Sequence, residues 1–197
     1  MTAQTTKSDS NPEPDSPESE QVTVDEWRSA NGALIEVTID TASWPAFLVD
    51  DLKSRGTVML DHIAGRESLA APMLSLLLCG DAEMQALNRQ HCGFDKPTNV
   101  LSFPAGDGWP GDDALIGDIA IAAEIVQREA KAAGLGPADH LLHLFTHGVL
   151  HLLGYDHIDD DMAQDMETRE VELLAGMNVA NPYLDDSSDI RTREPGA

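Results

Sequence analysis

The segment His-Gly-Val-Leu-His-Leu-Leu-Gly-Tyr-Asp-His, residues 147–157, places histidines at 147, 151 and 157 and a glycine at 154. On a helix, His147 and His151 are four residues apart and therefore share one face. Gly154 can end that helix in the left-handed conformation, so that the chain turns back and brings His157 towards the same place. Three imidazoles with one open position are typical of a catalytic zinc site, whereas structural sites usually have four protein ligands. We therefore predict that these three histidines bind one Zn²⁺ ion.

Gly148 distinguishes the sequence of this segment from that of the metal-binding helix in zinc proteases. In the protease pattern H-E-x-x-H, the glutamate is the general base that activates water. The wider spacing H-x-x-x-H-x-x-G-x-x-H is shared with the metzincin proteases, but the position of the base is taken here by Gly148. Glycine has no side chain to accept a proton, so another metal-dependent hydrolysis is favoured over peptidase activity. A divergent metallopeptidase that takes its base from elsewhere is the less favoured alternative.

Two further motifs precede the histidine segment. One contains Leu87-Asn88 followed by Asp-Lys-Pro-Thr-Asn-Val-Leu-Ser-Phe-Pro at residues 95–104, and the other is Gly-Asp-Ile at residues 117–119. Together with residues 147–157, they resemble in order and spacing the motifs of the YbeY family, over roughly residues 33–180. Members of that family are bacterial rRNA maturation factors, regarded as metal-dependent endoribonucleases specific for single strands.

The resemblance implies a zincin-like fold and an enzyme that hydrolyses phosphodiester bonds of RNA with Zn²⁺ as its cofactor. It also implies a role in rRNA maturation, including processing of the 3′ end of 16S rRNA, and in ribosome quality control. The partners that it implies are single-stranded rRNA and the small ribosomal subunit with its proteins or assembly factors. No oligomeric state follows from these motifs.

One position departs from the family pattern. The family usually has an arginine just before a glycine ahead of residues 95–104, where it is thought to contact substrate phosphate, and this chain has Cys92 before Gly93. A thiol lacks the fixed charge and the forked donors of a guanidinium. Either Arg89 or Lys96 contacts the phosphate instead, or the chain is a zinc-binding ribosome-assembly factor with little intrinsic catalysis. A neutral change at the edge of a loop is an equally open interpretation.

Asp156, beside the third histidine, is the remaining candidate catalytic residue. We expect Arg89 and Lys96 to hold a neighbouring phosphate, while Asp156 or a substrate oxygen takes the proton in place of the missing glutamate. Alternatively, Asp156 satisfies the backbone donors of a turn. His140 and His143 precede the segment on roughly the same helical face, either as partners that orient the ligands or as a polar stripe beside the site.

The chain is strongly acidic, with a net charge of −23 over 197 residues. Residues 1–26 hold seven acidic residues and one lysine, and residues 159–197 hold eleven acidic residues and three arginines. The part in between keeps a charge of −9, whereas nucleic-acid binders usually carry a basic surface, because neutralised phosphates drive their affinity. We therefore expect weak, salt-sensitive binding of free RNA, with the RNA presented by the ribosomal subunit. Alternatively, the acidic tails serve solubility alone.

Hydrophobic patterning predicts one α+β domain at residues 31–182. It indicates a small mixed four-stranded sheet, with strands at about 34–40, 73–79, 98–103 and 115–122. Helices packed on the sheet are predicted at about 43–63, 81–90, 123–133, 138–153 and 160–175. Polar composition predicts a disordered N-terminal tail at residues 1–30 and a flexible C-terminal tail at residues 183–197.

The helix from Asp159 to Glu172 is rich in acidic residues and is expected to present a solvated face. Its buried side is supplied by apolar residues, namely Met162, Met166, Val171, Leu173 and Leu174.

The two cysteines, Cys79 and Cys92, lack the spacing of a metal-binding pair and favour a reduced cytoplasmic protein. No apolar run approaches the ~20 residues that span a bilayer, so no membrane partner is expected.

Overall fold

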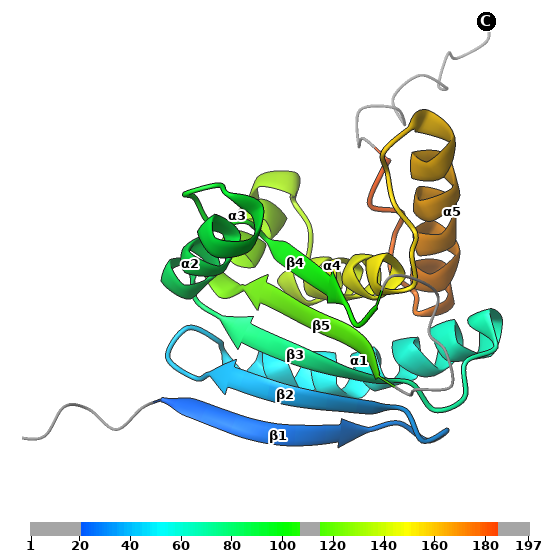
Figure 1. Cartoon of the computed structure of the whole chain (residues 1–197), viewed down its shortest axis with the longest axis horizontal. Helices are drawn as coiled ribbons and strands as arrows, with labels where there is room; N and C mark the ends of the chain where they lie inside the picture. The colour runs from blue at the N-terminus through cyan, green and yellow to red at the C-terminus, as the bar shows by residue number, and fades with distance from the viewer. Residues whose placement is uncertain (1–20, 107–114, 185–197) are drawn as a thin grey trace, which may run out of the picture.

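The computed structural model describes residues 21–106 and 115–184. Its strands form one mixed sheet in the order β1-β2-β3-β5-β4 (Figure 1). Strands β2, β3 and β5 are parallel to one another, while β1 and β4 are antiparallel strands at the two edges. The strands are β1 (Val22–Arg28), β2 (Leu34–Asp40), β3 (Met73–Cys79), β4 (Val100–Pro104) and β5 (Leu115–Ala122). The predicted α+β class with a mixed sheet is therefore confirmed, although the sheet has five strands rather than four.

The additional strand is β1, which falls inside the N-terminal tail predicted to be disordered as far as residue 30. That prediction was wrong over Val22–Arg28, because this segment pairs with β2 along all seven of its residues. Its alternating pattern buries the indole of Trp27, which is 1% exposed, and directs Val24 to solvent. The adjacent acidic residues Asp25 and Glu26, one on each side of the strand, masked this short alternation. The predictions for residues 1–20 and 185–197 lie outside the described residues.

Helices cover the two faces of the sheet unequally. The main core lies between one face and the helices α1 and α4, and α5 packs against both of these helices (Figure 1). A smaller apolar cluster on the other face includes Met84 from α2 and Ile125 from α3. The helices are α1 (Ala46–Glu67), α2 (Asp81–Cys92), α3 (Ala123–Ala133), α4 (Pro137–Leu152) and α5 (Asp160–Gly176). Within the described ranges, no helix has both the length and the apolar character needed to cross a membrane.

Helix α4 lies unusually close to the sheet at Gly148. A methyl group at this position would lie 3.1 Å from Ile119 Cδ1 and 3.2 Å from Ser102 Oγ. The glycine therefore has a packing role as well as the chemical consequence drawn from the sequence, because it allows α4 to rest on β4 and β5. This close approach places the histidines of α4 beside the edge strand β4.

Candidate metal centre

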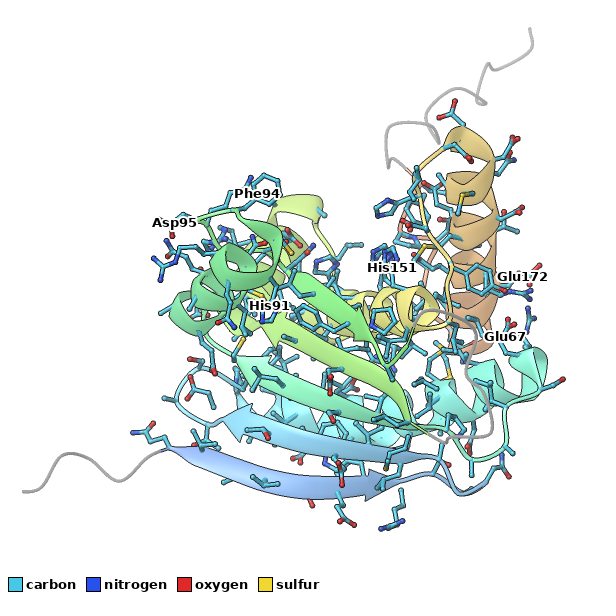
Figure 2. All side chains as sticks on the ribbon, in the orientation of Figure 1. Glu67, His91, Phe94, Asp95, His151 and Glu172 are labelled. Carbon is cyan, nitrogen blue, oxygen red and sulfur yellow. The ribbon has the colours of Figure 1, made fainter. Side chains whose placement is uncertain are left out.

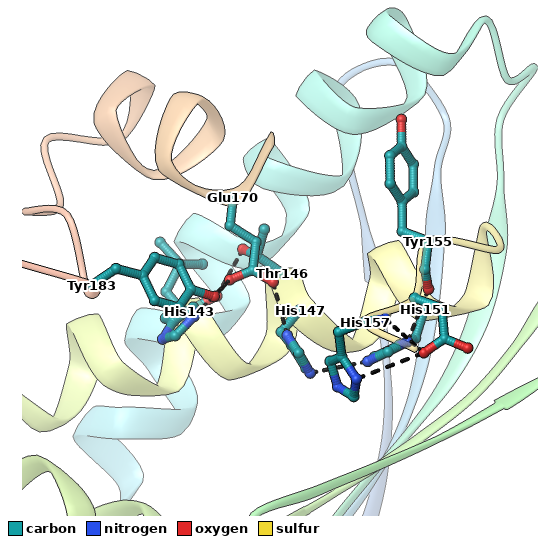
Figure 3. Close-up of polar contacts among 10 residues, drawn as sticks. His143, Thr146, His147, His151, Tyr155, His157, Glu170 and Tyr183 are labelled. Carbon is teal, nitrogen blue, oxygen red and sulfur yellow. Dashed lines mark hydrogen bonds and ion pairs between the residues drawn. The ribbon is translucent and has the colours of Figure 1, made fainter. Parts of the chain in front are cut away.

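The predicted turn after α4 brings the three histidines of the motif together. Gly154 has a φ of +87°, the left-handed conformation expected at the end of the helix. Its amide donates to the carbonyl of His151 at 3.0 Å, and the chain then reverses and carries His157 back (Figure 3). One nitrogen from each of His147, His151 and His157 lies within 4.8 Å of the other two.

The nitrogens of this cluster suit a metal ion. His151 Nδ1 lies 2.9 Å from the carbonyl oxygen of Tyr155. Since a carbonyl only accepts, Nδ1 carries the proton and the lone pair lies on Nε2, which is 3.1 Å from His147 Nε2. Nitrogens bound tetrahedrally to Zn²⁺ at ~2.0–2.1 Å would be separated by roughly 3.3 Å. The three imidazoles can therefore hold one metal ion, and no other side chain is needed to complete a three-ligand set.

Electrostatics keep His151 neutral, as metal ligation requires. Burial, with the neighbouring imidazoles of His147 and His157, lowers the pKa of His151 below its ordinary value of 6.5. A proton and a metal ion compete for the same lone pair. The lowered pKa keeps the ligand form available at mildly acidic pH.

We expect metal affinity to fall as the solution is acidified from about pH 8 to about pH 5, because the imidazoles then take up protons. The stability of the metal-free protein should fall in the same direction. The unfolded chain protonates His151 near its ordinary pKa, whereas the folded state resists that proton. Chelator competition and thermal unfolding across this range measure both effects. A metal affinity that did not change with pH would contradict ligation by imidazoles.

A buried carboxylate that the sequence analysis missed supports His147. Glu170 of α5 is fully buried and accepts hydrogen bonds from His147 Nδ1 at 2.7 Å, His143 Nε2 at 2.8 Å and Tyr183 Oη at 2.5 Å (Figure 3). Burial alone would raise the pKa of Glu170, but the three hydrogen bonds outweigh it and hold the pKa at about 2. Glu170 therefore favours its ionised form beside the three histidines.

Two predictions fail at this carboxylate. Glu170 does not belong to a solvated face, and Tyr183 does not belong to a free tail, since its hydroxyl donates to the buried carboxylate. A signal was present in the sequence: Glu170 follows Met166 by four residues and precedes Leu173 by three, so it falls within the apolar stripe of α5. His143 proves to be a partner of Glu170, and His140 pairs with Glu129 at 3.0 Å instead.

The three histidines open onto a polar cleft of about 560 Å³. Its lining includes the three histidines and Asp156 on one side, and residues that precede or form β4 on the other, among them Thr98, Asn99, Ser102 and Pro104. Asp156 Oδ1 accepts from the backbone amide of His157 at 2.8 Å and lies 3.7 Å from its Nδ1. Asp156 thus satisfies a turn donor and also lies beside a ligand.

The two predicted phosphate-binding cations lie outside this lining. Arg89 is exposed, with Nη1 3.7 Å from Asp95 Oδ1, and Lys96 is also exposed. The loop that carries Phe94 and Asp95 lies at the end of α2, away from His151 (Figure 2). The structure therefore brings Asp156 to the histidines, whereas Arg89 and Lys96 do not line the cleft.

Comparisons with known proteins agree with this site. The family model described as Endoribonuclease YbeY matches residues 45–178, which include all three histidines. An Endoribonuclease YbeY of Allorhizobium ampelinum is 44% identical over 158 residues, or 76% of this chain and 93% of that protein. One of Rhodospirillum rubrum is 53% identical over 117 residues, or 57% of this chain and 58% of that protein. A solution structure from Thermotoga maritima, 30% identical, covers 75% of this chain and 93% of its own, with a TM-score of 0.47. A chain with this histidine cluster and these relatives belongs to the YbeY family of endoribonucleases.

Proposed function

We propose that this protein is a Zn²⁺-dependent endoribonuclease that cleaves single-stranded rRNA during ribosome maturation, including the 3′ end of 16S rRNA, and in ribosome quality control. The observation that carries the proposal is the set of three converging imidazoles at the edge of a polar cleft. Three protein ligands leave a coordination position for substrate or water, as in catalytic zinc sites. The family match supports RNA as the substrate.

In this mechanism, His147, His151 and His157 would hold the metal ion. Bound Zn²⁺ supplies positive charge to the phosphoryl oxygens of the scissile phosphate. Asp156 lies in the cleft beside His157 and is placed to accept a proton, either from water or from the 2′-hydroxyl of the RNA. Arg89 and Lys96 would contact a phosphate farther along the strand, because they do not line the cleft.

The acidic surface supports ribosomal RNA presented by a partner over free RNA. A net charge of −23 repels a polyanion, so docking on the small ribosomal subunit or its assembly factors would supply the missing affinity. Both cysteines are free thiols, which agrees with action in the cytoplasm. The same charge, with Cys92 in place of an arginine, favours a second candidate function, a zinc-binding assembly factor with little catalysis.

The metallopeptidase alternative loses support in the structure. A Cβ at position 148 would lie 3.1–3.2 Å from side-chain atoms of Ile119 and Ser102, so a glutamate there would require these neighbours to shift by a few tenths of an ångström. The deciding experiment is cleavage of a single-stranded rRNA fragment by protein of measured zinc content. Cleavage that disappears with the metal and returns with Zn²⁺ would support the nuclease. Stoichiometric zinc without any cleavage would favour the assembly factor.

Replacing Cys92 with arginine tests the loop after α2. Cys92 is exposed, so a guanidinium can be added without disturbing the core. If this loop contacts RNA, Cys92→Arg should strengthen RNA binding severalfold. The slope of log affinity against log salt concentration should also become steeper, by the amount expected for about one phosphate contact. Filter binding of single-stranded RNA at several salt concentrations measures this slope. Gln90→Arg, an added charge at a nearby exposed position, is the matched control, and equal effects of the two variants would show a general charge effect.

A further inference from the structure

The carboxylate of Glu170 touches a proposed metal ligand, yet no step of the proposed cleavage uses it. We propose that Glu170 is a positioning residue, which holds His147 in the tautomer and orientation that metal binding needs, with His143 and Tyr183 holding the carboxylate in place. This inference rests on the metal site of the proposed function and adds residues from α5 and from the segment that follows it.

The contact with Glu170 defines which nitrogen of His147 carries the proton. The two carboxylate oxygens of Glu170 are contacted by three groups that can donate, so we assign the proton in the 2.7 Å contact to His147 Nδ1. The lone pair then lies on Nε2, the atom that faces His151 Nε2 at 3.1 Å. The Tyr155 carbonyl does the same for His151 at 2.9 Å. Two independent acceptors thus leave the Nε2 lone pairs of His147 and His151 free to face the same point.

The carboxylate of Glu170 lies at a buried position of α5. Glu170 is 0% exposed and lies in the apolar stripe of α5, where a leucine or methionine would pack without a charge. A buried carboxylate is costly unless charge and hydrogen bonds compensate. Here it binds three donors, and one of them is a residue of the metal cluster. Stability alone does not require this arrangement, whereas an acceptor placed against His147 Nδ1 orients a ligand.

His143 and Tyr183, the other two donors, hold the carboxylate of Glu170 in place. His143 lies one helical turn before His147, and its Nε2 reaches Glu170 Oε2 at 2.8 Å, while His147 uses Oε1. Tyr183 donates to the same Oε2, and its ring packs edge-on against His143 with centroids 5.7 Å apart. Oε2 is therefore fixed by two groups and Oε1 is left to His147. The segment after α5 thus contributes, through Tyr183, to holding the carboxylate beside His147.

The test is Glu170→Leu, which removes both acceptor oxygens and suits the apolar stripe. Zn²⁺ affinity, measured by chelator competition, should fall about 10–100-fold, the usual effect of losing a partner of a metal ligand. Glu170→Gln keeps one acceptor and should lose less. Glu167→Leu removes an exposed carboxylate from the same helix and should leave affinity unchanged.

The metal-free proteins provide a second readout, which a purely structural role would not move. Nitrogen NMR of the histidine rings should show His147 protonated on Nδ1 in the natural protein and in Glu167→Leu. In Glu170→Leu the proton should shift towards Nε2. Unchanged affinity and an unchanged tautomer in a cooperatively folded Glu170→Leu would overturn the proposal. If that variant does not fold, the same two measurements on Glu170→Gln decide.

Failure of the proposed nuclease gives a different result. Natural protein that binds Zn²⁺ but cleaves no RNA would overturn the enzymatic function and leave the role of Glu170 standing. Natural protein that binds no metal would overturn the metal site, while the tautomer of His147 would still report whether Glu170 positions the ring.

Discussion

Replacing His151 with alanine is expected to abolish stoichiometric zinc binding and to lower RNA cleavage about a thousandfold or more. His151 has the shortest ring contacts of the cluster, with centroids 4.5 Å from His147 and 5.0 Å from His157, compared with 5.9 Å between His147 and His157. Without it, only two imidazole nitrogens remain to bind the metal ion, which is too few to hold it in competition with water. Metal content after dialysis and cleavage of single-stranded RNA measure the two effects.

The matched control for this change is His62→Ala. His62 is an exposed histidine on α1, so its loss tests the effect of removing an imidazole outside the site. Zinc content and cleavage should remain those of the natural protein. Full activity of His151→Ala would refute the metal-dependent mechanism, and loss of folding can be detected because the helix content and thermal transition would change as well.

The largest effect on stability is expected for Gly117→Ala. Gly117 has a φ of +145°, a conformation that only glycine adopts readily. A methyl group there would overlap the carbonyl oxygen of Phe103 and lie 2.8 Å from Leu152 Cδ2. Backbone strain and the clash with main-chain atoms together should cost about 3–5 kcal/mol of the free energy of unfolding.

Thermal or denaturant unfolding measures this loss, and Gly65→Ala is its control. Gly65 lies in α1 with no atom within 4 Å of an added methyl group, so alanine there should stabilise the protein by up to about 1 kcal/mol. A Gly117→Ala protein as stable as the natural one would show that β4 and the end of α4 can shift freely.

Local patterns in the sequence predicted the elements that carry the site. The histidine spacing with Gly154 predicted the helix, its end and the return of the chain, because all three depend on neighbouring residues. The strand β1 was missed because its stability comes from pairing with β2 and from burial of Trp27, neither of which its acidic composition reveals.

The supporting residues were harder to predict, because their roles depend on distant contacts. Glu170 lies 23 residues after His147, and only the packing of α5 on α4 brings the two together. An acidic residue on an acidic helix also resembles its exposed neighbours unless its place in the apolar stripe is noticed. Arg89 and Lys96 were chosen by proximity along the chain, and the fold leaves both outside the cleft.

Gly148 has a consequence for how this protein can change over evolutionary time. A single substitution to glutamate would restore the signature of a zinc protease, but its Cβ would lie 3.1–3.2 Å from side-chain atoms of Ile119 and Ser102, which would have to move by a few tenths of an ångström. A path from this scaffold to peptide hydrolysis must therefore adjust the packing of α4 on the sheet as well as supply the base. Packing and chemistry thus constrain the same position of the helix.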